Sequence, residues 1–173
     1  MRFLERLQNL FRTEAYRERL QQEADSVRRE DPQQFSLDLP TSLQMNDYSC
    51  SVECLYSVLQ FFEIDIPRRT VAQQIQVSRW FGASEDKIMR VLRQHKLAYK
   101  VIENGTPREL SKAIRSYKPV IVALDNDAHW AVVYGVSRRF IHLMDPDPAR
   151  MHEASPTRSE FRKRWDGWGI VVS

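Results

Sequence analysis

The stretch QMNDYSCSVECLYSVLQFF, residues 44–62, decides the fold. Its apolar side chains recur at helical spacing, at Val52, Leu55, Leu59 and Phe62. This pattern predicts a helix with one buried face, and it places Cys50 in the first turn. The free N–H groups and the dipole of a helix N-terminus stabilise a thiolate. The stretch therefore predicts a reactive cysteine at the start of a buried helix.

The second cysteine, Cys54, lies one turn further along the same predicted helix. It is further from the helix terminus, so we expect a small buried side chain rather than a nucleophile. Two cysteines four residues apart in a helix have the wrong geometry for a disulfide. The sequence thus provides no disulfide framework of the kind found in small secreted domains.

Three further helices are predicted before residue 118, over 69–77, over 84–94 and from Thr106 to about Tyr117. Acidic residues begin the second, where the helix dipole favours them. Thr106 and Glu109 have the form of a capping box, with Pro107 at the first helical position. These local signals predict a helical N-terminal half.

Beyond Lys118 the sequence changes to short runs of β-branched and aromatic residues, PVIVALD, HWAVVYGV and RFIHLMD, separated by polar turns. They predict a three-stranded antiparallel meander. A short helix at 159–165 and a closing strand at 168–172 complete the chain. Helices followed by strands predict an α+β fold.

Peptide-bond cleavage by a thiol needs an imidazole, a side chain that orients it and donors for the oxyanion. His129 begins one predicted strand and Asp145 follows the next, so antiparallel pairing brings both to the same end of the sheet. Gln44, six residues before Cys50, is a candidate oxyanion donor beside the Cys50 backbone N–H. These four residues are the candidate catalytic set.

Three motifs together resemble a known family: the stretch from Gln44 to Cys50, the strand that begins His129-Trp130, and the Asp145-Pro146 pair sixteen residues after the histidine. They closely resemble the bacteriocin-processing peptidases, papain-like enzymes that cut after double-glycine leader sequences and often form N-terminal domains of ABC exporters. The resemblance covers roughly residues 40–172. It implies a papain-like fold with Cys50 as nucleophile, His129 as base, Asp145 as its orienting residue and Gln44 as oxyanion donor.

The chain departs from that family at Ser51, where the family usually has glycine. No transporter follows, so the resemblance implies a free-standing member, here a papain-like cysteine peptidase domain over residues 35–173. Residues 1–34 are predicted as an amphipathic helix and a linker. A packing helix or a solvated arm is the simplest interpretation of that helix. A pro-segment, or a partner or membrane-surface contact, is the alternative.

Composition limits the class of protein. The chain has 173 residues, 42% of them hydrophobic, which predicts one globular domain with a buried core. Its 26 basic and 23 acidic residues are interleaved, so the net charge of +3 does not indicate nucleic-acid binding. No transmembrane span or signal peptide is evident. We therefore expect a cytoplasmic bacterial protein, or one delivered without a cleaved signal peptide.

The remaining notable residues have structural interpretations. His95 fits a helix end, and His142 and His152 have no partners at metal-ligand spacing, so we expect no metal and no cofactor. Trp80 and Phe81 interrupt the helices, where core packing is the simpler interpretation and lining a substrate cleft the alternative.

The leading functional hypothesis is a thiol peptidase acting on an extended peptide or flexible protein segment. An idle peptide-binding or transporter-docking module of the same fold is one alternative. A related acyl-transfer enzyme or a toxin effector is another. Cleavage that depends on Cys50 would separate the peptidase from the binding module.

Overall fold

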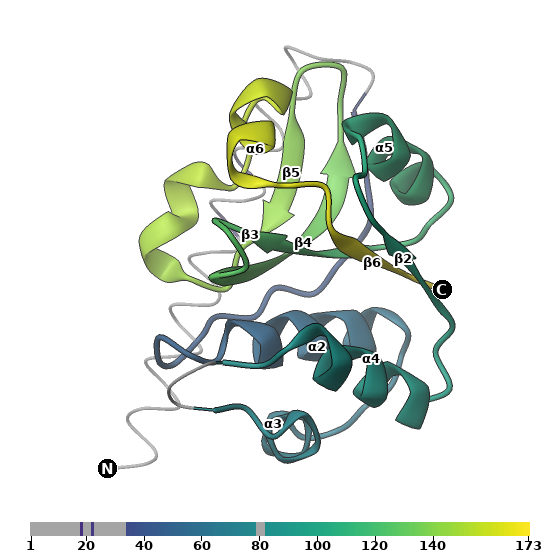
Figure 1. The fold of residues 1–173 in the computed structure, drawn as a ribbon, viewed down its shortest axis with the longest axis vertical. Helices are drawn as coiled ribbons and strands as arrows, with labels where there is room; N and C mark the ends of the chain where they lie inside the picture. Colours follow the sequence, from purple (N-terminus) through teal and green to yellow (C-terminus); the bar gives the residue numbers. More distant parts are fainter. Residues whose placement is uncertain (1–17, 19–21, 23–33, 79–81) are drawn as a thin grey trace.

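A layer of three helices forms one side of the molecule (Figure 1). The structure is a computed structural model that describes residues 18, 22, 34–78 and 82–173. The three helices are α2 (Cys50–Phe61), α3 (Arg68–Ile75) and α4 (Glu85–Gln94). They confirm the predicted helices to within about two residues at each end, the usual uncertainty of helix ends. Cys50 is the first residue of α2, as predicted.

The sheet contains six strands that pair antiparallel throughout. Strands β3 (Val120–Leu124), β4 (His129–Val136) and β5 (Ile141–Met144) form the predicted meander. The closing strand β6 (Gly169–Val172) pairs with β3. The α+β architecture predicted from the sequence is therefore confirmed.

Both faces of the sheet are buried, because helices cover each of them. On β3, Ile121 and Ala123 point to the core shared with α2, α3 and α4. Val120 and Val122 point to a second core, on the side of α5 (Pro107–Arg115) and α6 (Arg158–Arg164). This alternation explains why every residue of β3 is buried.

Capping boxes define the first residues of the two helices on that second face. The Thr106 hydroxyl accepts a hydrogen bond from the Glu109 backbone N–H, and the Glu109 carboxylate accepts one from the Thr106 backbone, as the sequence predicted. Thr157 and Glu160 form the same arrangement before α6. Each box satisfies N–H groups that have no partner within the helix.

Three elements differ from the sequence prediction. β2 (Tyr99–Ile102) lies between α4 and α5 and pairs along its whole length with β6. β1 (Phe35–Ser36) pairs with the end of β4, at the start of the predicted domain, where the sequence predicts no strand. A 3₁₀ helix, Pro148–Glu153, follows the end of β5. The two strands depend on partners far away in sequence, which local periodicity does not report.

The predicted amphipathic helix within residues 1–34 lies almost wholly outside the described residues, and so do Trp80 and Phe81. The proposed domain boundary at residue 35 stays a prediction. Within the described part of the chain, no helix has the length and apolar character needed to cross a membrane.

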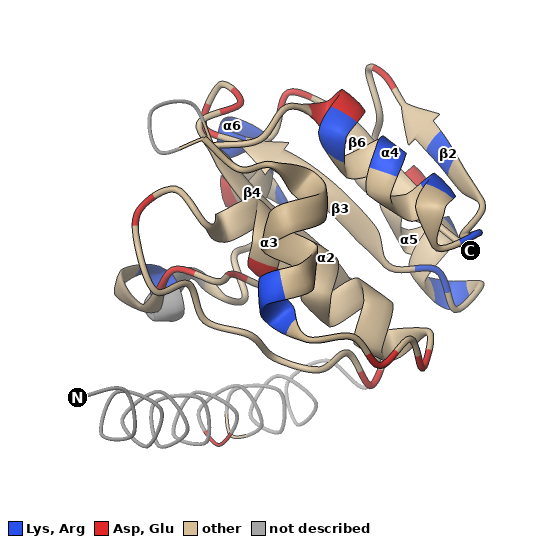
Figure 2. Ribbon diagram, turned by 90° about the horizontal axis from the view of Figure 1, so that it is seen from below, with Lys and Arg blue, Asp and Glu red and all other residues tan. Residues whose placement is uncertain are grey.

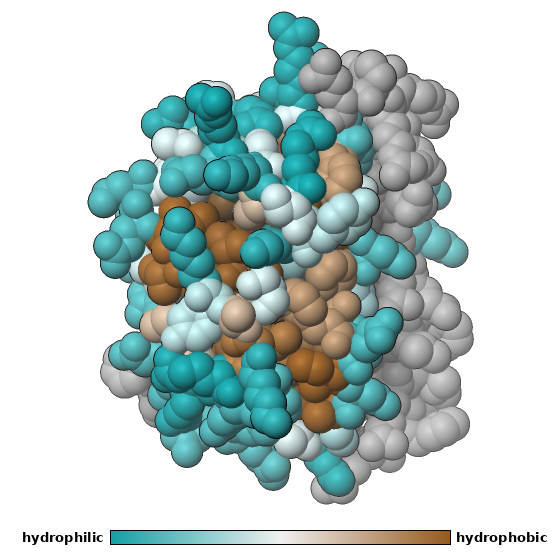
Figure 3. All heavy atoms as spheres, turned by 90° about the vertical axis from the view of Figure 1, so that its right-hand side faces the viewer, coloured by the Kyte–Doolittle hydropathy of each residue, from teal (hydrophilic) through white to brown (hydrophobic). Residues whose placement is uncertain are grey.

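Charged and apolar groups are mixed over the surface. Basic and acidic positions are both scattered over the helices and loops seen in Figure 2. On the face shown in Figure 3, apolar side chains reach the surface in the middle and hydrophilic ones surround them. Several half-buried apolar residues pack against the core shared with α2, among them Phe62, Ile64 and Leu97.

Candidate active site

Cys50 is buried at the N-terminus of α2, and its side chain retains little exposure to solvent. Ser49 is the N-cap, and its carbonyl oxygen accepts from the backbone N–H groups of Val52 at 3.0 Å and Glu53 at 3.2 Å. The first N–H groups of a helix have no carbonyl partner within it. The thiol therefore lies where backbone donors and the helix dipole favour negative charge.

His129 and Asp145 meet at one end of the sheet, as antiparallel pairing predicted. Strands β4 and β5 are neighbours, and Nε2 of His129 lies 2.7 Å from Oδ1 of Asp145. Their side chains are 6% and 1% exposed, so the pair is shielded from solvent. The same Asp145 oxygen accepts from the backbone N–H of Asp147 at 2.9 Å, which fixes the carboxylate.

The Cys50 thiol and the Asp145 carboxylate both interact with the imidazole of His129. Burial by itself lowers the pKa of His129, but hydrogen bonds to Asp145 and Cys50, and the charges of both groups, raise the pKa to about 9. Because Nε2 is bonded to Asp145, Nδ1 is the ring nitrogen left for the thiol. The arrangement favours an imidazolium at His129 beside the Cys50 thiol.

Gln44 lies on the loop before α2 and is tied to the Asp145 loop. Its backbone N–H donates to the carbonyl oxygen of Pro146 at 2.8 Å. Its side-chain Oε1 is buried without a hydrogen-bond partner among the described residues. The four residues selected from the sequence thus come from three loops or element ends that meet at one edge of the sheet.

Cys54 behaves differently from Cys50. It is completely buried, and desolvation together with nearby negative groups raises the pKa of its thiol well above the usual value. A thiol in such surroundings is a poor nucleophile. The structural role predicted for Cys54 agrees with this environment.

An ion-pair network holds the turn that precedes His129. Asp125 accepts from Arg164 through Nε and Nη2, both at 2.9 Å, and also from Arg150. Hydrogen bonds and the charges of the two arginines lower the pKa of Asp125 to about 2, against a smaller opposing effect of burial. Arg150 also lies 3.5 Å from the Asp147 carboxylate, so it links this turn to the Asp145 loop.

A second cluster of polar groups lies in and beside the first turn of α2, and the sequence did not predict it; Ser42 and Glu53 are buried in it, while the Arg68 side chain is 34% exposed. Glu53 is 1% exposed in the first turn of α2. Its Oε2 accepts from the Ser42 hydroxyl and lies 3.1 Å from Nε of Arg68. Nη2 of Arg68 also donates to the Ser42 hydroxyl at 2.9 Å. Burial raises the pKa of Glu53, while the charge of Arg68 and the hydrogen bond from Ser42 lower it.

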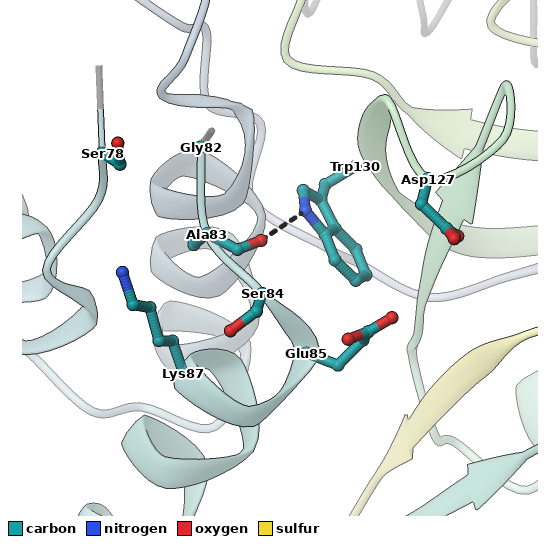
Figure 4. A pocket seen from close by; sticks show the side chains of 8 residues that line it. All are labelled: Ser78, Gly82, Ala83, Ser84, Glu85, Lys87, Asp127 and Trp130. Carbon is teal, nitrogen blue, oxygen red and sulfur yellow. Dashed lines mark hydrogen bonds between the residues drawn. The ribbon is translucent and has the colours of Figure 1, made fainter. Parts of the chain in front are cut away.

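A pocket of about 300 Å³ opens between the segment before α4 and the start of β4 (Figure 4). Trp130, which follows His129, forms one wall, and its indole N–H donates to the carbonyl oxygen of Ala83 at 3.1 Å. Gly82 lines the opposite side, where an added methyl group would lie 3.9 Å from the carbonyl oxygen of Tyr48. The pocket therefore lies close to both the Cys50 loop and the His129 strand.

The other histidines have structural contacts. Nε2 of His95, at the end of α4, lies 2.9 Å from Oε1 of Gln74. His142 is buried, with Nδ1 2.9 Å from the Ser155 hydroxyl. Within the described ranges, no cluster of three or more His, Cys, Asp or Glu residues could hold a metal ion.

A helical layer that presents a cysteine at a helix N-terminus, packed on an antiparallel sheet that supplies a histidine, defines the papain-like cysteine peptidase fold. The model of the Peptidase C39 family matches residues 38–173, and the chain belongs to that family. A search of curated proteins found no match.

Solved structures support the same fold. A double-glycine motif protease from an AMS/PCAT transporter, crystallised with its leader peptide, superposes with a TM-score of 0.67 at 20% identity, covering 80% of this chain and 93% of that one. A putative C39-like peptidase from Bacillus anthracis gives 0.64 at 15% identity, with 81% and 97% covered. The peptidase domain of Streptococcus ComA gives 0.62 at 14%, with 76% and 96% covered.

Proposed function

We propose that the protein is a thiol peptidase that hydrolyses a peptide bond in an extended peptide or a flexible protein segment. The observation that supports this most directly is one buried imidazole, that of His129, bonded to the Asp145 carboxylate at 2.7 Å and to the Cys50 thiol. Membership in a family of cysteine peptidases supports the reaction class.

In the first half of the proposed reaction, the Cys50 thiolate attacks the carbonyl carbon of the scissile bond. The negative charge that develops on the carbonyl oxygen is stabilised by the backbone N–H of Cys50 and the side-chain N–H of Gln44. His129 then gives its proton to the leaving amine as the C–N bond breaks. The product is a thioester on Cys50 and a free peptide amine.

In the second half, neutral His129 takes a proton from water, which attacks the thioester. The carboxylic acid leaves, and the thiolate–imidazolium pair forms again. Asp145 keeps the imidazole oriented through both steps, because its own carboxylate is fixed by the backbone N–H of Asp147.

The substrate class is proposed as an unfolded peptide segment. The pocket beside Trp130 lies next to both the His129 strand and the Cys50 loop, which makes it a candidate subsite for such a segment. The AMS/PCAT protease of similar fold was crystallised with a leader peptide. Leader peptides that end in two glycines are therefore the first substrates to test.

The test compares Cys50→Ala and His129→Ala with wild type on a peptide panel that includes double-glycine leaders, read by mass spectrometry. Cys54→Ala is the matched control, since it removes a thiol one turn away. We expect a loss on the order of 10³-fold or more in the first two variants and near wild-type cleavage in the control.

Two results would contradict the proposal. Wild type and variants could be equally inert, while the wild-type thiol also fails to react with an electrophilic peptide probe. Alternatively, a peptide could bind tightly to Cys50→Ser and to wild type without turnover, which would indicate a binding module of the same fold.

A further inference from the structure

Glu53 is a buried carboxylate that the proposed reaction does not use. It follows Cys50 by three residues on α2, so the two side chains are neighbours on one side of the helix. A negative charge there competes with the thiolate for the same helix N-terminus. A buried carboxylate without a partner would also strongly destabilise the fold. Its partners therefore matter for the thiol as well as for the fold.

Arg68 and Ser42 supply those partners from two other parts of the chain. Arg68, the first residue of α3, lies 3.1 Å from the Glu53 carboxylate and donates to the Ser42 hydroxyl at 2.9 Å. Its guanidinium also lies over the Tyr56 ring, 5.4 Å from the centroid. The positive charge is thus held between α2 and α3, where it can offset the charge of Glu53.

Ser42 connects this cluster to the loop that carries Gln44. The loop is held at two points only two residues apart, by the Ser42 hydroxyl on Glu53 and by the Gln44 backbone N–H on Pro146. Pro146 directly follows Asp145. The position of Gln44 relative to Cys50 is therefore set from both the helical side and the sheet side.

We propose that Ser42, Glu53 and Arg68 form a positioning cluster with two effects: it tethers the Gln44 loop to the nucleophile helix, and it cancels the negative charge beside the thiol. The inference rests on the proposed function, since Gln44 has a role only in an acyl transfer. The other ionisable groups around Cys50 are His129 from β4, Asp145 after β5 and the Cys54 thiol on α2.

The charge effect is tested by the rate of Cys50 alkylation with iodoacetamide as a function of pH, with Cys54→Ala as background. This assay needs no peptide cleavage, so its result can be interpreted even if the protein does not cleave peptides. Arg68→Ala should move the pH profile of alkylation to higher pH. Glu53→Gln should not move the alkylation profile to higher pH. The Arg68→Ala/Glu53→Gln double variant should have a profile close to that of the unsubstituted protein. Arg68→Lys should largely keep the profile of the unsubstituted protein. Arg69→Ala, which removes an exposed neighbouring arginine, is the control.

The tether is tested by Ser42→Ala, which changes no charge. We expect kcat for a cleaved peptide to fall roughly tenfold with little change in KM, because an oxyanion donor acts in the transition state. The thiol titration should stay in place. In the Arg68→Ala/Glu53→Gln double variant, kcat should largely recover together with the alkylation profile, because the glutamine amide oxygen can still accept a hydrogen bond from the Ser42 hydroxyl.

Two outcomes would overturn the inference. One is an unchanged thiol titration in Arg68→Ala, measured under conditions where its thermal unfolding shows it to be folded. The other is full kcat in Ser42→Ala. If Arg68→Ala does not fold, Glu53→Gln carries the charge test: it leaves the 34% exposed Arg68 side chain unopposed, so the alkylation profile should move to lower pH, and an unchanged profile would overturn the inference.

Discussion

Nε2 of His129 and Oδ1 of Asp145 lie 2.7 Å apart, in side chains that are 6% and 1% exposed. The hydrogen bond uses one ring nitrogen and leaves the other for the Cys50 thiol. A carboxylate in this place therefore determines both the tautomer and the orientation of the ring.

Asp145→Asn tests that relationship with little change in shape. The amide can present an N–H to the ring where the carboxylate presented an acceptor, so it favours the wrong tautomer. We expect kcat to fall by at least ~10² while substrate binding changes little. Steady-state kinetics on the peptide cleaved best by wild type would measure this. Near wild-type kcat in Asp145→Asn would show that Asp145 does not orient the base.

The pH dependence of stability follows from the same pair. The pKa of His129 is raised from 6.5 to about 9. A group with a raised folded-state pKa stabilises the protein fully below its unfolded value, and the stabilisation is lost as the pH rises through the folded value. With Cys50→Ala in every protein compared, so that the thiol exchanges no proton of its own, we expect a loss of up to about 3 kcal/mol in the free energy of unfolding between pH 6.5 and about 9.

Urea unfolding across that pH range would measure the loss, with Asp145→Asn as the comparison. The variant lacks the carboxylate that favours the imidazolium, so its stability should change much less over the same range. Parallel pH profiles for the two proteins would contradict the assignment of the raised pKa to the His129–Asp145 pair.

Asp125 offers a test of the turn that presents His129. Its φ of 57° lies in the left-handed region, which asparagine also tolerates. Asp125→Asn therefore keeps the backbone and removes the charge that binds Arg150 and Arg164. We expect a loss of about 1 kcal/mol in unfolding free energy, because the carboxylate is about one-third exposed and partly screened by solvent.

The acid side of the pH profile provides the readout for Asp125. Its pKa is lowered from 3.8 to about 2, so its stabilisation is present above pH 3.8 and is lost as the pH falls through about 2. Acid unfolding followed by circular dichroism should show this step in wild type and not in Asp125→Asn. Asp127→Asn, at an exposed position of the same turn, is the matched control.

The main helices, the meander and the catalytic candidates could be predicted from sequence because each has a local signal. Thr106, Pro107 and Glu109 define a helix start within four residues, and runs of β-branched and aromatic residues predict β3 and β4. β2 has no local signal of this kind. It forms a strand because it pairs with β6, some 70 residues further along the chain. Ser42, Glu53 and Arg68 also come from separate parts of the chain. A glutamate in a helix predicts a solvated face, and only the fold shows that it is buried.

Ser51 is the residue at which the sequence departs from the family it resembles, and the structure gives a specific reason to test it. The side chain is completely buried, and its hydroxyl has no hydrogen-bond partner among the described residues. A buried hydroxyl without a partner lowers stability, so Ser51→Ala should raise the unfolding free energy by up to about 1 kcal/mol. Ser51→Gly removes the same hydroxyl but adds backbone entropy to the unfolded chain, so it should be about 1 kcal/mol less stable than Ser51→Ala.

Denaturant unfolding of wild type, Ser51→Ala and Ser51→Gly would separate these contributions, with Ser57→Ala as a comparison because the Ser57 hydroxyl contacts the sulfur of Met144. If Ser51 only packs, kcat should stay within about twofold of wild type in both variants, since no reacting group contacts the hydroxyl. A loss of stability above about 1 kcal/mol in Ser51→Ala would instead mean that the hydroxyl has a partner, such as a buried water. The serine beside the nucleophile would then hold the first turn of α2, and its replacement of glycine would be a requirement of this chain rather than a tolerated change.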